Sequence, residues 1–181
     1  HTRVYHTRPT REVLLEAVTR QFHSGEGAIQ FAPEAIARSN ADLLNTPELR
    51  REFIEIYCDQ GRDEARRWLD LHHGPMDAAE LEHRLGRYGL NPCGEILGAD
   101  FHCNLAEIHL NQIDPSDDEG QRDAFRAAAL SVACLLNRPF EVERYRQSRA
   151  WDPIVGVSFT GLFDFFVHAF GTPWLQWWEA G

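Results

Sequence analysis

Amphipathic helical segments that alternate with short strand-like segments predict an α/β fold for this chain of 181 residues. Helix-start signals stand at Thr10, Thr46 and Asp77, each followed by apolar residues at helical spacing. An apolar run at residues 154–159 predicts a buried strand, and the residues after Cys103 alternate as in a half-buried strand. We expect one domain, because domains commonly run to about 100–150 residues.

The N-terminal segment predicts one helix and one strand. Thr10 is the expected N-cap, Gly25 marks the end of the helix, and residues 28–31 form the expected strand. The apolar face of this helix consists of Leu14, Leu15, Val18 and Phe22.

Residues 46–71 predict two further helices. Thr46 is a cap, and Pro47 suits the first helical position because its missing N–H has no partner there. A second, arginine-rich helix follows Gly61 and ends near Leu71.

A third helix follows a break at residues 74–75, which are Gly-Pro. Asp77 is its expected cap and Gly89 its expected stop. Residues 1–89 are therefore expected to be mostly helical.

Residues 90–113 predict a loop and a strand. Proline and glycine on either side of Cys93 require a turn. Ala106, Ile108 and Leu110 then fall on one face of the strand expected over residues 103–113.

Residues 114–181 predict a helix, a strand and a second helix. The polar connection 114–120 carries acidic residues that suit a helix start. The strand at residues 154–159 is followed, after Gly161, by an aromatic-rich helix. The expected buried face of the helix after residue 120 consists of Phe125, Ala129, Val132 and Leu136.

The composition excludes several functions. A formal net charge of −10 argues against a nucleic-acid partner. All 18 basic residues are arginine, so Schiff-base chemistry and a P-loop lysine are excluded. No apolar run approaches the ~20 residues of a membrane span, and no secretion signal follows His1. We expect a soluble, cytoplasmic chain.

The aromatic residues near the end of the sequence suggest a piece of a larger protein. Trp174, Trp177 and Trp178 stand within five residues and need other groups to bury them. Exposed, they would instead serve an interaction module as a partner anchor.

The most informative motif is the run Asn91-Pro92-Cys93-Gly94-Glu95, with Cys103-Asn104-Leu105 ten residues beyond its cysteine. On an extended turn, side chains two positions apart point the same way, so Asn91, Cys93 and Glu95 can face one ligand. Each also has an ordinary interpretation, as a turn residue, a small hydrophobe and a solvated charge.

This motif resembles the finger loop of ribonucleotide reductase catalytic subunits, where the loop passes through a ten-stranded α/β barrel. Residues 25–29 and 156–161 resemble pieces of the same barrel. The resemblance implies part of that barrel, with a helical run before the active-site loop.

The resemblance also implies a role for each residue of the motif. Cys93 would be the thiyl radical that removes the 3′ hydrogen of the ribose, and Glu95 the general base on the 3′ hydroxyl. Asn91 would hydrogen-bond the sugar hydroxyls. Cys103 would belong to the redox pair that ends as a disulfide.

The short spacing between the two cysteines, with Pro92 and Gly94 in the motif, resembles the adenosylcobalamin-dependent class more than the di-iron class, which remains the alternative. The implied partners are a ribonucleotide substrate, nucleotide effectors, a thioredoxin-like or dithiol reductant and the remaining segments of the reductase. No cobalamin contact is assigned. Cys58 and Cys134 lie in helical patterns and are expected to be structural core residues rather than partners of Cys103.

Two further interpretations of the charged and metal-binding residue types remain. A zinc site could use Cys93, His102, Cys103 and one histidine of the pair at residues 72–73, although the spacing matches no common pattern. The arginines of the helical run alternate with acidic residues, which is typical of solvated helix faces.

Overall fold

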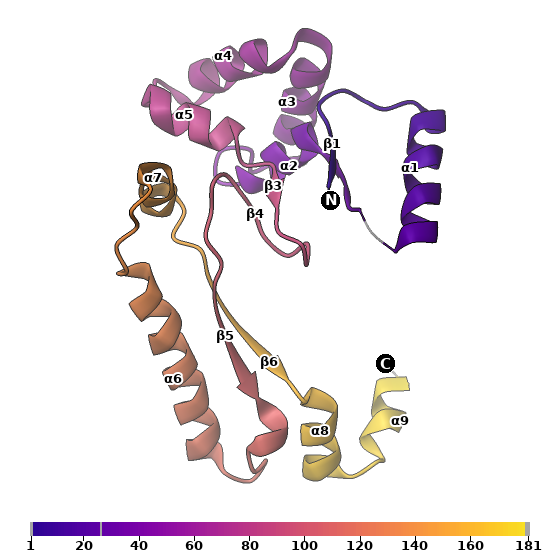
Figure 1. Ribbon diagram of the computed structural model, residues 1–181, viewed down its shortest axis with the longest axis vertical. Helices are drawn as coiled ribbons and strands as arrows, with labels where there is room; N and C mark the ends of the chain where they lie inside the picture. The colour runs from indigo at the N-terminus through magenta and orange to yellow at the C-terminus, as the bar shows by residue number, and fades with distance from the viewer. Residues whose placement is uncertain (1, 26, 180–181) are drawn as a thin grey trace. The chain divides into compact units, whose positions relative to one another are not determined.

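The computed structural model describes residues 2–25 and 27–179. Its architecture is mixed α/β, with 57% helix and 12% strand, which confirms the predicted class. The described residues form three two-stranded sheets and no closed barrel (Figure 1). The chain divides into two compact units, His1–Asp100 and Phe101–Gly181, although the sequence shows no internal boundary.

The first unit contains five helices among its described residues. Two short strands, β1 and β2, pair in parallel, and β3 and β4 form an antiparallel hairpin. In chain order the elements are β1 Arg3–Tyr5, α1 Arg11–Ser24, β2 Ile29–Phe31, α2 Ala32–Ser39, α3 Pro47–Gln60, α4 Arg62–His73, α5 Ala78–Leu85, β3 Gly89–Leu90 and β4 Leu97–Gly98.

The predicted helix caps of this unit are confirmed. The Thr10 hydroxyl accepts a bond from the Val13 amide at 3.4 Å, and the Thr46 hydroxyl accepts one from the Leu49 amide at 3.2 Å. The Asp77 carboxylate accepts bonds from two amides at the start of α5. Each cap supplies an acceptor to N–H groups that have no partner inside the helix.

The predicted end of α5 is wrong. The helix stops at Leu85 and is capped by Gly86, whose amide bonds to the Glu82 carbonyl at 3.0 Å. A Cβ atom at Gly86 would lie 3.3 Å from the Ala99 side chain, so a larger residue there would require Ala99 to shift slightly. Gly89 instead begins β3.

The apolar core of the first unit lies between α2, α3, α4 and α5. Phe53 and Leu69 are fully buried at its centre, and Tyr57 is 4% exposed. By contrast, the apolar face of α1 is open, with Phe22 82% exposed.

A buried polar network fixes the segment that leads into the hairpin. The Asn40 side chain, fully buried, donates to the Ile36 and Arg84 carbonyls at 2.8 and 3.0 Å. Its oxygen accepts a bond from the buried Arg87 guanidinium at 2.9 Å, and the Ser39 hydroxyl donates to the Arg87 carbonyl. Because these groups satisfy one another, α2 holds the start of β3 in place.

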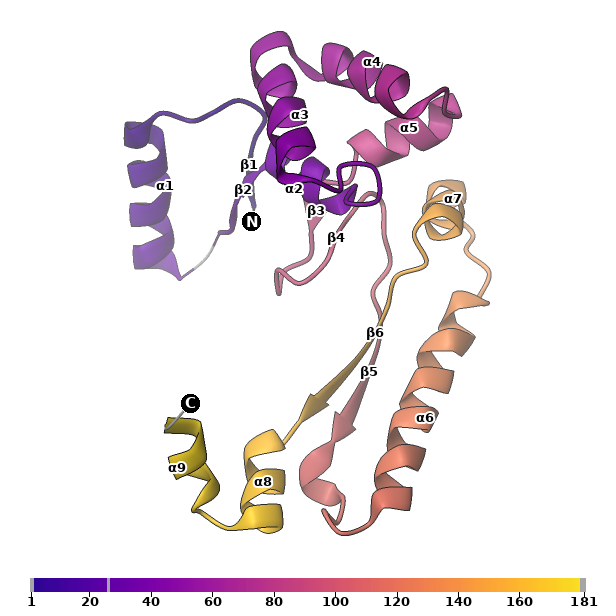
Figure 2. The same ribbon diagram turned by 180° about the vertical axis from the view of Figure 1, so that it is seen from behind.

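The second unit contains one parallel strand pair and four α-helices among its described residues. Strands β5 and β6 pair in parallel from Asn104↔Val155 to His109↔Thr160, and α6 packs against both (Figure 2). In chain order the elements are β5 Asn104–His109, the 3-10 helix η1 Leu110–Gln112, α6 Asp118–Leu136, α7 Glu143–Trp151, β6 Val155–Thr160, α8 Leu162–Phe170 and α9 Trp174–Glu179.

The predicted burial of β6 is wrong. Val155, Val157 and Phe159 are 44, 37 and 47% exposed, whereas Ile108 of β5 is 6% exposed. Helix α6 contacts β5 more extensively than β6, so β5 is the better covered strand.

Two of the four residues expected on the buried face of α6, Phe125 and Ala129, are exposed. Val132 is 4% exposed as predicted, but Ala128 is buried in place of Ala129, and Phe125 is 42% exposed. Ala124, Ala128 and Val132 are four residues apart, and this spacing keeps them on the side of α6 that contacts β5.

The terminal aromatic residues pack on one another. Trp174 contacts Phe163 and Phe166 with ring centroids 5.5 and 5.3 Å apart, while Trp177 is 63% exposed. The expected third member, Trp178, lies outside the residues whose side chains are described. None of the described helices is both long and apolar enough to cross a membrane.

Candidate functional site

The motif around Cys93 forms the tip of the β3–β4 hairpin. Gly89 pairs with Gly98 and Leu90 with Leu97, and the Asn91 amide bonds to the Ile96 carbonyl at 3.3 Å. The predicted loop is therefore confirmed, and it is closed by backbone bonds on both sides.

A β-turn sets the position of Cys93 inside this loop. The Gly94 amide bonds to the Asn91 carbonyl at 3.0 Å, which places Pro92 and Cys93 at the two central turn positions. Proline favours the first central position because its φ is fixed, and Cys93 keeps a negative φ, as a type I turn requires. Gly94 has φ +83°, a conformation that disfavours other residues.

The Asn91 side chain spans the loop rather than pointing outwards. It is 8% exposed, its Nδ2 donates to Glu95 Oε1 at 2.5 Å, and its Oδ1 accepts from the Ile96 amide at 3.0 Å. Asn91 and Glu95 are thus brought together, and a neutral amide holds the carboxylate without adding a charge.

Cys93 and Glu95 are both exposed at the tip. The loop therefore presents a thiol and an oriented carboxylate to an incoming ligand, two residues apart on a turn restrained by Pro92 and Gly94. This arrangement suits hydrogen transfer at sulfur combined with proton transfer at a neighbouring oxygen.

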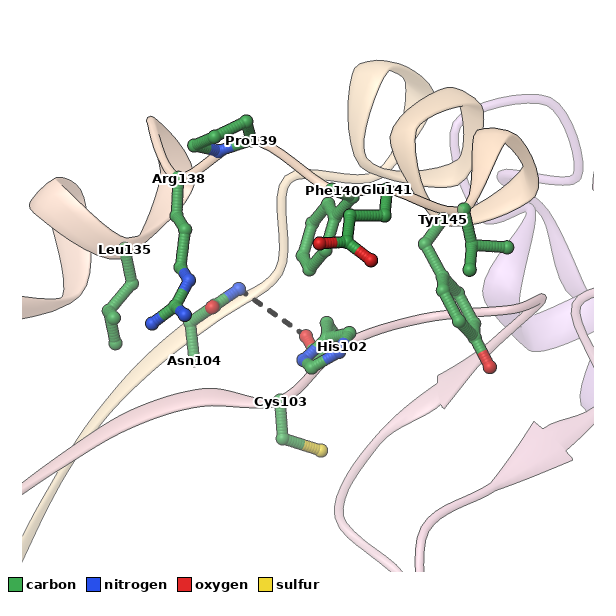
Figure 3. A pocket seen from close by; sticks show the side chains of 10 residues that line it. His102, Cys103, Asn104, Leu135, Arg138, Pro139, Phe140, Glu141 and Tyr145 are labelled. Carbon is green, nitrogen blue, oxygen red and sulfur yellow. Dashed lines mark hydrogen bonds between the residues drawn. The ribbon is translucent and has the colours of Figure 1, made fainter.

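Cys103 belongs to the second unit, whereas the other predicted site residues belong to the first. It directly precedes β5, is exposed, and lines an open pocket of about 490 Å³ (Figure 3). The next residue, Asn104, is 7% exposed and donates to the Ile154 carbonyl at 3.0 Å, which fixes the chain beside Cys103 to the start of β6.

Aromatic side chains form one wall of this pocket. The His102 ring lies 4.7 Å from the Phe140 ring and, at 89°, 5.7 Å from the Tyr145 ring. The Arg149 guanidinium stacks over Phe140 at 4.5 Å. The sequence interpretation missed Phe140 and Tyr145, because no spacing pattern links them to Cys103. The available signal in the sequence is that both aromatic residues closely follow the run Asn137-Arg138-Pro139, which ends a helix.

The two remaining cysteines differ. Cys58 of α3 is half-buried against the core, as expected, and burial raises the pKa of its thiol, partly offset by the nearby Arg8. Cys134 of α6 is exposed, so its expected place in a core is wrong. It follows Val132 by two residues, which turns it away from the helix face that contacts β5.

The described residues hold no group of three or more His, Cys, Asp or Glu side chains placed to bind a metal ion. Among the expected zinc ligands, His102 packs against Phe140, and His72 stacks on Trp68 with ring centroids 4.7 Å apart.

Comparison with protein-family models, curated proteins and solved structures finds no match to this chain.

Proposed function

We propose that this chain is the segment of a ribonucleotide reductase that carries the radical loop, of the adenosylcobalamin-dependent class, and that it acts in deoxyribonucleotide synthesis. The observation that carries the proposal is the hairpin tip, where Cys93 is exposed and Glu95, two residues further along the chain, has its carboxylate held by the Asn91 amide.

In this proposal Cys93 exchanges a hydrogen atom with the substrate. As a thiyl radical it takes the 3′ hydrogen of the ribose and later returns it, since an S–H bond is close in strength to an activated ribose C–H bond. The exposed position of Cys93 supports this role, because a thiol packed in a core could not reach a sugar.

Glu95 accepts the proton of the 3′ hydroxyl, and Asn91 orients the carboxylate and the sugar. Asn91 uses both ends of its amide inside the loop. Contact with a sugar hydroxyl therefore requires that the hydroxyl share or replace the Asn91–Glu95 bond.

Cys103 supplies one of the two thiols that reduce the substrate. The 2′ hydroxyl leaves as water, two electrons and two protons come from a pair of thiols, and the pair becomes a disulfide. A thioredoxin-like or dithiol reductant then restores the pair. The open pocket beside Cys103 supports access of this kind.

The proposed fold is part of a ten-stranded α/β barrel completed by the remaining segments of the reductase. Two observations support it: β5 and β6 are parallel and joined through α6 and α7, and the apolar residues of β6 are half-exposed. Parallel strands usually occur in sheets with helices on their faces, so further segments are the expected cover.

The fit of adenosylcobalamin is poor in the pocket beside Cys103. An open space of about 490 Å³ is too small for a corrin ring with its nucleotide arm. No described residue is therefore assigned to the cofactor. The proposal places the chain in the cytoplasm, where its thiols stay reduced, with nucleotide effectors as further partners.

The experiment is deoxynucleotide formation by the complete reductase that contains this chain, with adenosylcobalamin and a dithiol. We expect Cys93→Ala to abolish product, and Cys134→Ala, at an exposed cysteine outside the loop, to retain it. Cofactor-independent product that still needs Cys93 would move the chain to the di-iron class. Turnover unchanged by Cys93→Ala would end the proposal.

A further inference from the structure

We propose that Glu107 and His109 of β5 bind a divalent transition-metal ion such as Zn²⁺, with water completing its coordination. This inference concerns the open face of the β5–β6 pair and does not rest on the proposed reductase function. Three observations carry it: the shared face of the two side chains, their place at the ends of two parallel strands, and the distance between their ligand atoms.

Glu107 and His109 lie on the face of β5 that is turned away from α6. Ile108, between them, is 6% exposed and belongs to an apolar cluster with Ala128 of α6. Because successive side chains of a strand alternate between its two faces, both neighbours of Ile108 point the other way. The side chains of Glu107 and His109 are 54% and 64% exposed, so a dissolved ion can reach both.

This face is polar near the carboxyl ends of two parallel strands. Glu107 pairs in register with Ser158 of β6, and His109 pairs with Thr160 (Figure 2). Parallel strands usually carry apolar side chains on both faces, whereas ligands of open α/β sheets bind beyond the carboxyl ends of the strands. A carboxylate, an imidazole and two hydroxyls at this position therefore indicate a polar ligand rather than a packing surface.

The distance between the two ligand atoms suits a shared metal ion. His109 Nε2 lies 3.7 Å from Glu107 Oε1, which is longer than a hydrogen bond of roughly 2.7–3.2 Å. Zinc bonds to imidazole nitrogen and carboxylate oxygen are about 2.1 Å long, so a tetrahedral ion holds two such atoms about 3.4 Å apart. A slight side-chain rotation closes the difference, and the ion would then lie between the two atoms.

The ligand types select the class of ion. Imidazole nitrogen suits Zn²⁺, Ni²⁺ and related ions, whereas Mg²⁺ and Ca²⁺ prefer oxygen ligands. Among the residues that the structure describes, neither Glu107 nor His109 has a side-chain hydrogen bond, so an ion would replace only their exposed ion pair, which is a weak interaction. Two protein ligands leave the remaining positions to water, so we expect an exchangeable ion.

The experiment records amide spectra of the full chain by nuclear magnetic resonance during titration with Co²⁺. A paramagnetic ion broadens only nearby signals, so ions that bind the exposed thiols elsewhere in the chain are told apart by position. We expect saturable broadening centred on residues 107–109 of β5 and on their register partners in β6, residues 158–160. Excess Zn²⁺ should displace Co²⁺ and restore these signals.

His109→Gln and Glu107→Gln each remove one ligand. Each should weaken Co²⁺ binding at this position by about tenfold or more, since loss even of a group that only orients a metal ligand costs about that much. His23→Gln, at an exposed histidine of α1, is the matched control and should leave the broadening unchanged. Titration without broadening at residues 107–109, or equal broadening there in His109→Gln and His23→Gln, would overturn the inference.

Discussion

The strongest local prediction concerns Asn91, whose amide spans the loop. In Asn91→Asp the side chain keeps its size and an oxygen for the Ile96 amide, but the group facing Glu95 becomes a second carboxylate. A hydrogen bond to a charged group contributes about 1.5–3 kcal/mol, and two like charges about 4 Å apart in water add about 1 kcal/mol of repulsion. We expect the native loop to lose about 2–4 kcal/mol at neutral pH.

Hydrogen exchange at the Ile96 amide measures this loss directly, because that N–H bonds to the Asn91 side chain. If the loop opens locally, a cost of this size lowers the hydrogen-exchange protection factor of the Ile96 amide by about 30- to 1000-fold. Asn137→Asp, an exposed asparagine after α6, is the control. Equal Ile96 protection in Asn91→Asp and the parent chain would refute the geometry.

Three further predictions test the two units. Mass spectrometry after brief iodoacetamide treatment should find Cys58 modified last, since burial raises the pKa of its thiol while the other three cysteines are exposed. Urea unfolding should show a larger loss of stability for Gly161→Ala than for Gly94→Ala. Both glycines have a positive φ, +73° and +83°, and for Gly94→Ala, in open space, we expect only the backbone strain of roughly 1–2 kcal/mol. In Gly161→Ala the new Cβ would also lie 2.8 Å from the Asn111 side chain, and equal losses in the two variants would contradict this packing. Burial lowers the pKa of His73, so its contribution to stability is present above the unfolded-state pKa and is lost as pH falls from that value through the lower folded-state pKa. A pH series should show a smaller loss of stability in His73→Gln, and identical pH profiles would refute the assignment.

The helices with side-chain caps could be predicted from the sequence, whereas helices without such caps could be predicted only where a glycine marks their start, as for α4 after Gly61 and α8 after Gly161. Thr10, Thr46 and Asp77 each bond to an amide at the start of a helix. The missed helices α2 and α7 begin after Phe31 and Val142, whose side chains accept no such bond. The missed strand β1 has three residues and depends on parallel pairing with β2, 26 positions away.

The loop around Cys93 was also predictable, because Pro92 and Gly94 restrict the backbone on both sides. The inward direction of Asn91 was not, since it depends on the Ile96 amide across the hairpin. The exposure of Cys134 and of β6 could not be predicted from the sequence either. Apolar spacing indicates which residues can be buried, but not whether a neighbouring segment covers them.

The central claim is that Cys93 carries the radical chemistry, and the most direct measurement is deoxynucleotide formation by the complete reductase with and without Cys93→Ala. The account predicts cobalamin-dependent product from the parent protein and from Cys134→Ala, and none from Cys93→Ala. Product formation at the parent rate by the Cys93→Ala protein would contradict it.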